Sequence, residues 1–283
     1  ARDFAAATLS ESEALVDPET ATVELRVVYD SGPVFTFGEL QIDGLKKYRP
    51  DLVERYNTIK PGDRYEQERL LALLSDLQNT SYFSSVDVKI DVDDRTPQRV
   101  PIQVSLVESD SKRLGLGAGY SSNTGFRTEA NYQFNNLFDR AYSLATGLRL
   151  EQKRQSAFAD VFFPPSRKGV VDSVGVSVDH QTVSNLEVDR TSVGAVRQYT
   201  LGPSEFRLGV NFQLEDRRAQ GVNFGGTQAL VPSASLTRNQ VDDRLNPRNG
   251  YIAFGQVAGA SEALASDQDF LRLFGKVQQF WSP

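Results

Sequence analysis

The chain has 283 residues, a formal net charge of −6 and a pI of about 5.0, so no overall positive field favours binding to nucleic acid. It contains no cysteine and a single histidine, His180, which excludes disulfides, thiolate or imidazole-cluster metal sites and histidine-based catalytic triads. No apolar run reaches the roughly 18 residues that a membrane-spanning helix requires. We therefore expect no catalytic, cofactor-binding or metal-binding residues in this chain, and no enzymatic activity.

The first predicted element is a strand at 22–29, where apolar and polar residues alternate before a turn at 30–33. No partner strand is evident before it in the sequence. We therefore interpret residues 1–32 as the end of a preceding domain.

Residues 33–109 predict a small α+β module in the order β-α-α-β-β. In its second helix, four leucines have the spacing of an amphipathic helix. Pro50 suits the first turn of the first helix. The elements are expected as a strand at 34–43, a short helix opened by Pro50, a helix at 66–79 with Leu70, Leu73, Leu74 and Leu77, and strands at 85–93 and 100–108 joined by a turn at 94–97.

The rest of the chain, residues 110–283, repeats one unit: a stretch of alternating apolar and polar residues followed by a turn. In 206–215, for example, Phe206, Leu208, Val210, Phe212 and Leu214 alternate with polar residues and one glycine. Successive side chains on a strand point to opposite faces, so each stretch has one apolar and one polar face. Many such strands are typical of an antiparallel outer-membrane β-barrel. About ten strands are predicted, at 114–121, 126–135, 141–151, 156–163, 171–182, 188–200, 204–216, 228–239, 250–259 and 269–281.

The connections between these strands fall into two alternating sets. The first set is predicted at 136–139, 164–169, 201–203 and 246–250. The second set, at 152–155, 182–188, 217–226 and 260–267, is generally longer and more polar. Short turns on one side and long loops on the other are typical of barrels with periplasmic turns and extracellular loops.

Several segments of the α+β module resemble a known family. Residues 37–44, 61–65, the leucine-rich helix and 81–86 are similar to a POTRA domain, the polypeptide-transport-associated module of outer-membrane assembly proteins. The order of POTRA domain and barrel resembles the BamA/TamA superfamily. Within it, the Ser-Tyr-Phe run after the second helix is most similar to the last POTRA domain of TamA, the outer-membrane subunit of the translocation and assembly module.

On this resemblance, residues 1–32 are the end of a preceding POTRA domain, 33–109 form a POTRA domain, and 110–283 are the N-terminal portion of a barrel. The resemblance implies a factor of the Gram-negative outer membrane, with its POTRA domains in the periplasm. Such a factor would help autotransporter-type clients fold and insert through a lateral seam of the barrel. The implied partners are a periplasm-spanning TamB-like protein, client outer-membrane proteins and outer-membrane lipids, without a cofactor.

Barrels of the resembled family have about sixteen strands and a lumen loop with an Arg-Gly-aromatic motif. That motif does not occur in this sequence, and methionine is absent even at position 1. We therefore expect the chain to be a fragment, processed or cut from something longer, that lacks several C-terminal strands.

The first barrel strand is the candidate for the seam. Glycine weakens a strand and permits close backbone approach. The glycines of this strand therefore provide either space for a bulky neighbour inside the barrel or an edge that pairs weakly, to which a client strand can add. The strand comprises Leu114, Gly115, Leu116, Gly117, Ala118, Gly119 and Tyr120, with its three glycines on one face.

A turn at 242–250 resembles the Asn-Pro-x-x-Gly turn that joins barrel strands in the family. Proline fixes φ and Asn-Gly supplies positive φ, so Asn246, Pro247 and Gly250 predict a tight hairpin. Its role is expected to be mainly structural.

Other functions stay open at this point. A central BAM-type assembly subunit would have the same architecture, and a passive pore or two-partner secretion channel would have the same barrel pattern. An outer-membrane hydrolase would need a nucleophile beside a base, but the sequence gives His180 no partner motif. A β-rich soluble adhesin is the remaining alternative.

Overall fold

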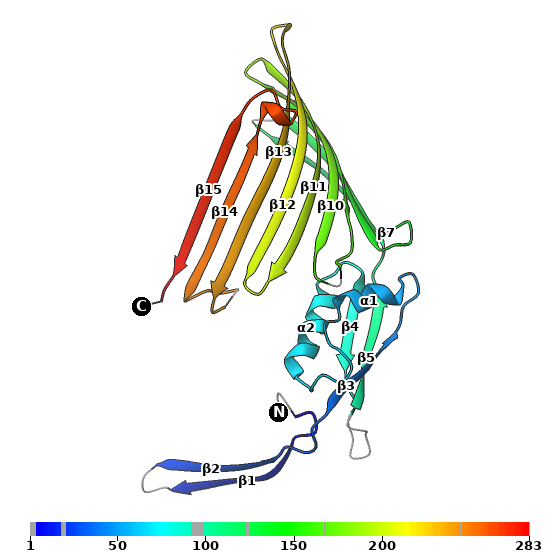
Figure 1. The fold of residues 1–283 in the computed structure, drawn as a ribbon, viewed down its shortest axis with the longest axis vertical. Coiled ribbons are helices and arrows are strands. Elements are labelled where there is room, and N and C mark those ends of the chain that lie inside the picture. The colour runs from blue at the N-terminus through cyan, green and yellow to red at the C-terminus, as the bar shows by residue number, and fades with distance from the viewer. Residues whose placement is uncertain are drawn as a thin grey trace. The chain divides into compact units, whose positions relative to one another are not determined.

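The structure is a computed structural model that describes residues 4–17, 21–91, 99–122, 125–166, 168–243 and 245–282. It separates into two compact units, Ala1–Ser109 and Asp110–Pro283, each described by itself below (Figure 1). In the described part of the chain, no helix has the length and apolar character needed to cross a membrane. The turn predicted at 94–97 lies outside the described residues.

The first unit begins with an antiparallel hairpin of β1 (Thr8–Asp17) and β2 (Thr22–Asp30). The expectation that the strand at 22–29 has no partner before it was therefore wrong. The partner strand gives a weak pattern in the sequence because Glu11, Glu13 and Ala14 are residues that strands disfavour. The assignment of residues 1–32 to a preceding POTRA domain stays a prediction.

The α+β module that follows has the predicted order of elements. It consists of β3 (Thr36–Asp43), α1 (Pro50–Tyr56), α2 (Gln67–Gln78), β4 (Phe83–Lys89) and β5 (Arg99–Glu108). In its sheet, β5 is central, parallel to β3 and antiparallel to β4.

The core of this module follows the helical spacing of the leucines and the alternation of residues along the strand, both seen in the sequence. Leu70, Leu73 and Leu77 of α2 are buried on one side of the helix, as their spacing predicts. On β5, every second residue is buried, which matches a strand with one covered face: these residues are Val100, Ile102, Val104 and Leu106.

The second unit is one antiparallel sheet of ten strands in which every strand pairs with its neighbours in sequence. The prediction of a POTRA domain followed by about ten barrel strands is confirmed, and the sheet is curved but not closed (Figure 1). Its edges are β6 and β15. The strands are β6 (Lys112–Ser121), β7 (Gly125–Leu137), β8 (Tyr142–Glu151), β9 (Arg154–Phe162), β10 (Val171–Val183), β11 (Leu186–Leu201), β12 (Ser204–Ala219), β13 (Val222–Val241), β14 (Gly250–Ala260) and β15 (Phe270–Phe280).

The register gives this sheet two chemically different faces. Val176 lies opposite Val193, and Val193 lies opposite Phe212, so apolar residues line up across strands. We call this side the apolar face; it carries Leu114, Leu116, Tyr120, Val176, Val193, Leu208, Phe212, Val257 and Leu273. We call the other side the polar face; it carries Arg127, Glu129, Arg149, Asp179, Arg190, Asn211 and Glu215.

The apolar face is exposed rather than packed. Every buried hydrophobic residue of the described chain lies between Phe35 and Leu106, with the single exception of Ala141. By contrast, Leu116 and Leu273 retain 77% and 73% of their accessible surface. Soluble monomers rarely expose contiguous apolar surface of this extent, whereas the outer band of a transmembrane barrel consists of it.

The connections differ from the prediction. Residues 182–188 and 217–226 are mostly strand rather than long loops, and the turns there are Ser184-Asn185 and Gln220-Gly221. All four turn residues have positive φ, between 49° and 78°, as two-residue hairpin turns of the type I′ class require. Strands therefore take the place of these two expected loops: β11 and β12 have 16 residues each and β13 has 20. The connection from β14 to β15 does form a loop, which contains the short 3-10 helix η1 (Glu262–Leu264).

Candidate functional site

The candidate seam strand forms as β6, at one edge of the sheet. It pairs with β7 along one side, and no described strand pairs along its other side. An unpaired strand side presents backbone N–H and C=O groups that can add a further strand. Leu116 and Tyr120 point to the apolar face, where they are 77% and 70% exposed.

The three glycines of β6 lie together on the polar face. Gly115, Gly117 and Gly119 are opposite Asn131, Glu129 and Arg127 of β7, respectively. A Cβ at Gly117 would lie 2.8 Å from the Glu129 Cγ, so Gly117 makes room for that side chain. At Gly119, the nearest atom would be 3.7 Å away, so packing does not require this glycine.

The polar face holds a series of ion pairs across neighbouring strands. Glu215 is the most enclosed carboxylate of these, with 5% of its side chain exposed, and it contacts both Arg190 and Arg217. Such a face suits the interior of a barrel, where water and polar groups are present. The other pairs are Arg149–Glu129 at 3.2 Å and Arg154–Asp179 at 2.8 Å.

Aromatic pairs lie near both ends of the apolar face. Near the end where β6 begins, Tyr199 stacks on Phe206 with ring centroids 4.9 Å apart. Near the opposite end, Tyr120 meets Phe126 edge-on at 5.1 Å. Aromatic girdles at the two membrane interfaces are a property of transmembrane barrels.

The family-like turn is a wider loop than the predicted tight hairpin. The Asp242 carboxylate accepts hydrogen bonds from the N–H groups of Asp243, Arg248 and Asn249, each at 3.0 Å. The N–H bonds from Asn249 and Arg248 hold the Asp242 pKa below its ordinary value. The loop is closed by this carboxylate, which the sequence interpretation missed.

The predicted turn residues have unequal roles in this loop. Gly250 has a φ of 119°, and a Cβ there would collide with the Gln240 carbonyl oxygen. Asn249 does not have positive φ, so the expected Asn-Gly turn does not form. Asn246 and Pro247 lie within the loop between Asp242 and Gly250.

His180 has a partner that its sequence neighbourhood does not indicate. Its Nδ1 lies 2.6 Å from the Asp189 Oδ1 across β10 and β11, and Arg218 is 3.7 Å from the same carboxylate. The histidine thus belongs to a charged cluster. Among the described residues, no group of three or more metal-ligating side chains comes together.

Comparison with known proteins agrees with both units. Residues 35–109 match the family model POTRA, described as surface antigen variable number repeat. The chain is 23% identical over 244 residues to the outer membrane protein assembly factor BamA of Nitratidesulfovibrio vulgaris, covering 82% of this chain and 30% of that protein. It is 26% identical over 218 residues to BamA of Neisseria meningitidis serogroup B, covering 75% of this chain and 26% of that protein. The chain therefore spans about a third or less of these relatives.

Solved structures share the fold. BamA from Haemophilus ducreyi lacking POTRA domains 1–3 superposes with a TM-score of 0.72 at 14% identity, covering 98% of this chain and 57% of that one. CdiB from Escherichia coli gives a TM-score of 0.60 at 11% identity, covering 98% and 55%. At these identities the likeness is one of fold.

The fold and the comparisons define a class: a POTRA domain followed by part of a BamA-like outer-membrane barrel. This is the architecture of the BamA/TamA superfamily, and the relatives support that level and not TamA in particular. The protein lies in the outer membrane, with the POTRA domain in the periplasm. Because β6 begins only a few residues after β5, the end of the sheet where β6 begins is the periplasmic end.

Proposed function

We propose that the protein is an outer-membrane protein assembly factor that helps client β-barrels fold and insert, without covalent chemistry. The curated relatives bear the name of such a factor, and they match both the POTRA domain and the sheet. The observation on which the proposal depends most is β6, the first strand of the sheet, whose three glycines share the polar face.

In this proposal, the side of β6 that faces away from β7 pairs with a client strand through backbone hydrogen bonds. Such pairing supplies affinity without requiring a particular client sequence. Glycine at 115 and 119 keeps the edge easily deformed, because glycine lowers the stability of a strand. The POTRA domain receives clients or periplasmic partners. Among the described residues, β4 is an edge strand of its sheet, whereas the start of β3 is covered by backbone hydrogen bonds from residues 62–65.

At a finer level, we propose a TamA-type role with autotransporter-like clients and a TamB-like periplasm-spanning partner. The support for a TamA-type role is the sequence of residues 81–86, whereas the relatives named above are BamA proteins. Co-purification tests it. A TamA-type protein retains a TamB-like partner and its loss affects autotransporters selectively, while loss of a BAM-type subunit impairs outer-membrane proteins in general.

The runner-up is an export channel or passive pore, since CdiB structures share the fold. The absence of cysteine from the chain allows a clean test. A cysteine at position 116 of β6 should form disulfides with cysteines in the terminal strand of a client during assembly. Normal client assembly with no such cross-link anywhere along β6 would exclude the edge-pairing function.

A pair of variants tests whether the glycines of β6, rather than the residues on its apolar face, affect client assembly. Gly119→Val adds a side chain without a close contact, and we expect slower client assembly while the protein itself still folds. Leu116→Val, on the opposite face of the same strand, is the control and should assemble clients at the normal rate. Equal client assembly by both variants would refute a role for the glycines.

A further inference from the structure

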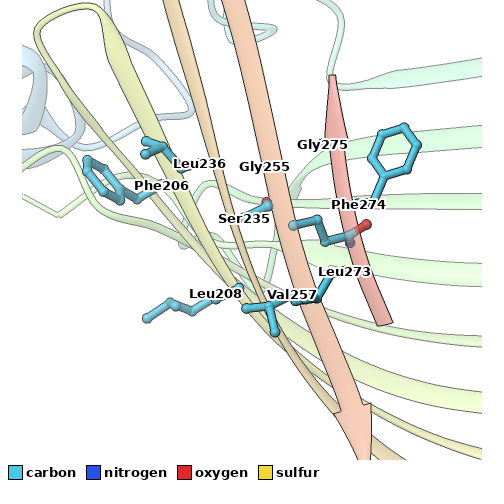
Figure 2. A pocket seen from close by; sticks show the side chains of 11 residues that line it. Phe206, Leu208, Ser235, Leu236, Gly255, Val257, Leu273, Phe274 and Gly275 are labelled. Carbon is cyan, nitrogen blue, oxygen red and sulfur yellow. The ribbon is translucent and has the colours of Figure 1, made fainter. Parts of the chain in front are cut away.

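The apolar face contains a hollow over β12 to β15. Its volume is about 620 Å³, and it opens at the surface between apolar side chains of four successive strands. Figure 2 shows Phe206, Leu208, Leu236 and Val257 on one side of the strands, with the Phe274 ring pointing away from them. The hollow therefore lies on the membrane side of the sheet.

Two glycines produce the hollow. Gly255 and Gly275 lie opposite each other in the register of β14 and β15, and Leu236 lies opposite Gly255 on β13. Neither glycine has positive φ, and a Cβ at Gly255 would meet nothing within 4 Å. At Gly275, the nearest atom would be 3.9 Å away. Folding therefore requires neither glycine, and their effect is to leave space that a side chain would fill.

A cation lies close to the hollow on the same face. Arg238 follows Leu236 by two residues on β13, a distance of about 7 Å along a strand. Its neighbours across the strands are the small residues Ser204 and Ala253, so the guanidinium is exposed.

Hydrogen bonds hold Arg238 in place without neutralising it. Its Nε and Nη2 donate to the Gln240 Oε1 at 3.3 and 3.1 Å, and the Tyr251 hydroxyl donates to the same oxygen at 3.2 Å. Within the described parts of the chain, Arg238 forms no ion pair with a carboxylate.

A second arginine on the apolar face shows the contrast. Arg197 is four residues from the periplasmic end of β11, and Arg238 is three residues from the periplasmic end of β13. Arg197, however, donates from Nε and Nη2 to the two oxygens of Asp172, at 2.8 and 3.0 Å. Of these two interfacial cations, Arg238 is the one that retains an uncompensated charge for a ligand.

We propose that this surface binds one glycerophospholipid of the periplasm-facing leaflet. The lipid phosphate accepts hydrogen bonds from the Arg238 guanidinium N–H groups that do not bond to Gln240, at the level where headgroups lie near the periplasmic end of the strands. One acyl chain runs deeper and fills the hollow over Gly255 and Gly275. Counted from the periplasmic end of β13, the cation comes first and the apolar hollow next. A phospholipid has the same order, with the phosphate at the surface and the acyl chains deeper. The proposal requires the membrane location only, and does not depend on the assembly role.

The test uses the intact protein in nanodiscs that contain a photoactivatable phospholipid with the reactive group on an acyl chain. After illumination, cross-linked peptides are identified by mass spectrometry. We expect β13, β14 and β15 peptides of the unmodified protein to be labelled above the level of the other strands. Gly255→Leu, which fills the hollow, should remove this excess. Arg238→Gln should lower it about fivefold, the effect of one interfacial cation.

The double variant Asp172→Asn with Arg197→Gln is the control, because it removes a neutralised pair at a similar depth on the same face. It should leave the labelling of β13 to β15 unchanged. Labelling that is equal on all strands, or that survives Gly255→Leu, would overturn the proposal and leave a surface with ordinary boundary lipid. Gly255→Ala serves if the leucine variant folds poorly, with a smaller loss of labelling expected.

Discussion

Removal of the Glu108 carboxylate should loosen the loop that precedes α1 in the POTRA domain. One oxygen of this side chain, Oε1, accepts hydrogen bonds from three successive N–H groups, those of Lys46, Lys47 and Tyr48, at 2.7, 2.8 and 3.0 Å. Burial raises the pKa of Glu108, but the three N–H bonds outweigh it and the pKa lies below its ordinary value of 4.5. The ionised form is therefore the one that the fold stabilises.

The expected magnitude follows from the exposure of the three donors. In Glu108→Ala, water can replace the carboxylate at the exposed Lys46 and Lys47 N–H groups, while the Tyr48 N–H is partly buried. A hydrogen bond to a charged group contributes about 1.5–3 kcal/mol, so a loss of about 2 kcal/mol is reasonable for this loop. That loss corresponds to a roughly 30-fold increase in the equilibrium constant for local opening of this loop.

Hydrogen exchange of the three amides measures this opening. We expect faster exchange at residues 46–48 in Glu108→Ala. In the unmodified protein, the stabilisation should be fully present above pH 4.5 and be lost as the pH falls through the lowered pKa. Glu39→Ala, which removes an exposed ion pair with Arg99, is the control, with a change within about 0.5 kcal/mol. Unchanged exchange in Glu108→Ala, or an equal change in the control, would refute the reasoning.

Three further predictions concern single positions. Leu77→Ala, at a fully buried site, should lower the free energy of unfolding of the POTRA domain by about 2–5 kcal/mol in a denaturant titration. Gly44→Ala should unfold much of the same domain in circular dichroism, because Gly44 has a φ of 92° and a Cβ there would collide with the Leu106 carbonyl oxygen; a native spectrum would contradict this. Asp242→Ala should speed tryptic cleavage after Arg248 about tenfold, because three N–H groups of the loop lose the carboxylate that accepts their hydrogen bonds. An unchanged rate would show that other contacts hold the loop.

Much of the fold could be predicted because its elements have clear periods. The leucines of α2 and the alternation in β12 fix the helix and the strand from local sequence alone. The strand β1 was missed because Glu11 and Glu13 conceal its pattern. The long hairpins were mistaken for loops because the turns that close them, Ser184-Asn185 and Gln220-Gly221, are short and lie among polar residues.

The candidate site was predictable only in part. Period two alone places the β6 glycines on one face, but the crowding of Gly117 by Glu129 depends on the register between β6 and β7. The same limit applies to Gly255 and Gly275, which are 20 residues apart and become neighbours only through the pairing of β14 with β15. Contacts across strands are long-range, and no local pattern specifies them.

The apolar face of the sheet is expected to meet lipid hydrocarbon and the polar face to meet water. Because the chain has no cysteine, single cysteines can be placed along β12 and carry a spin label. Labels at 208, 210 and 212 should be accessible to oxygen dissolved in the bilayer, whereas labels at 209, 211 and 213 should be accessible to a water-soluble nickel complex. Accessibility without a period of two, or with the opposite phase, would contradict this expectation.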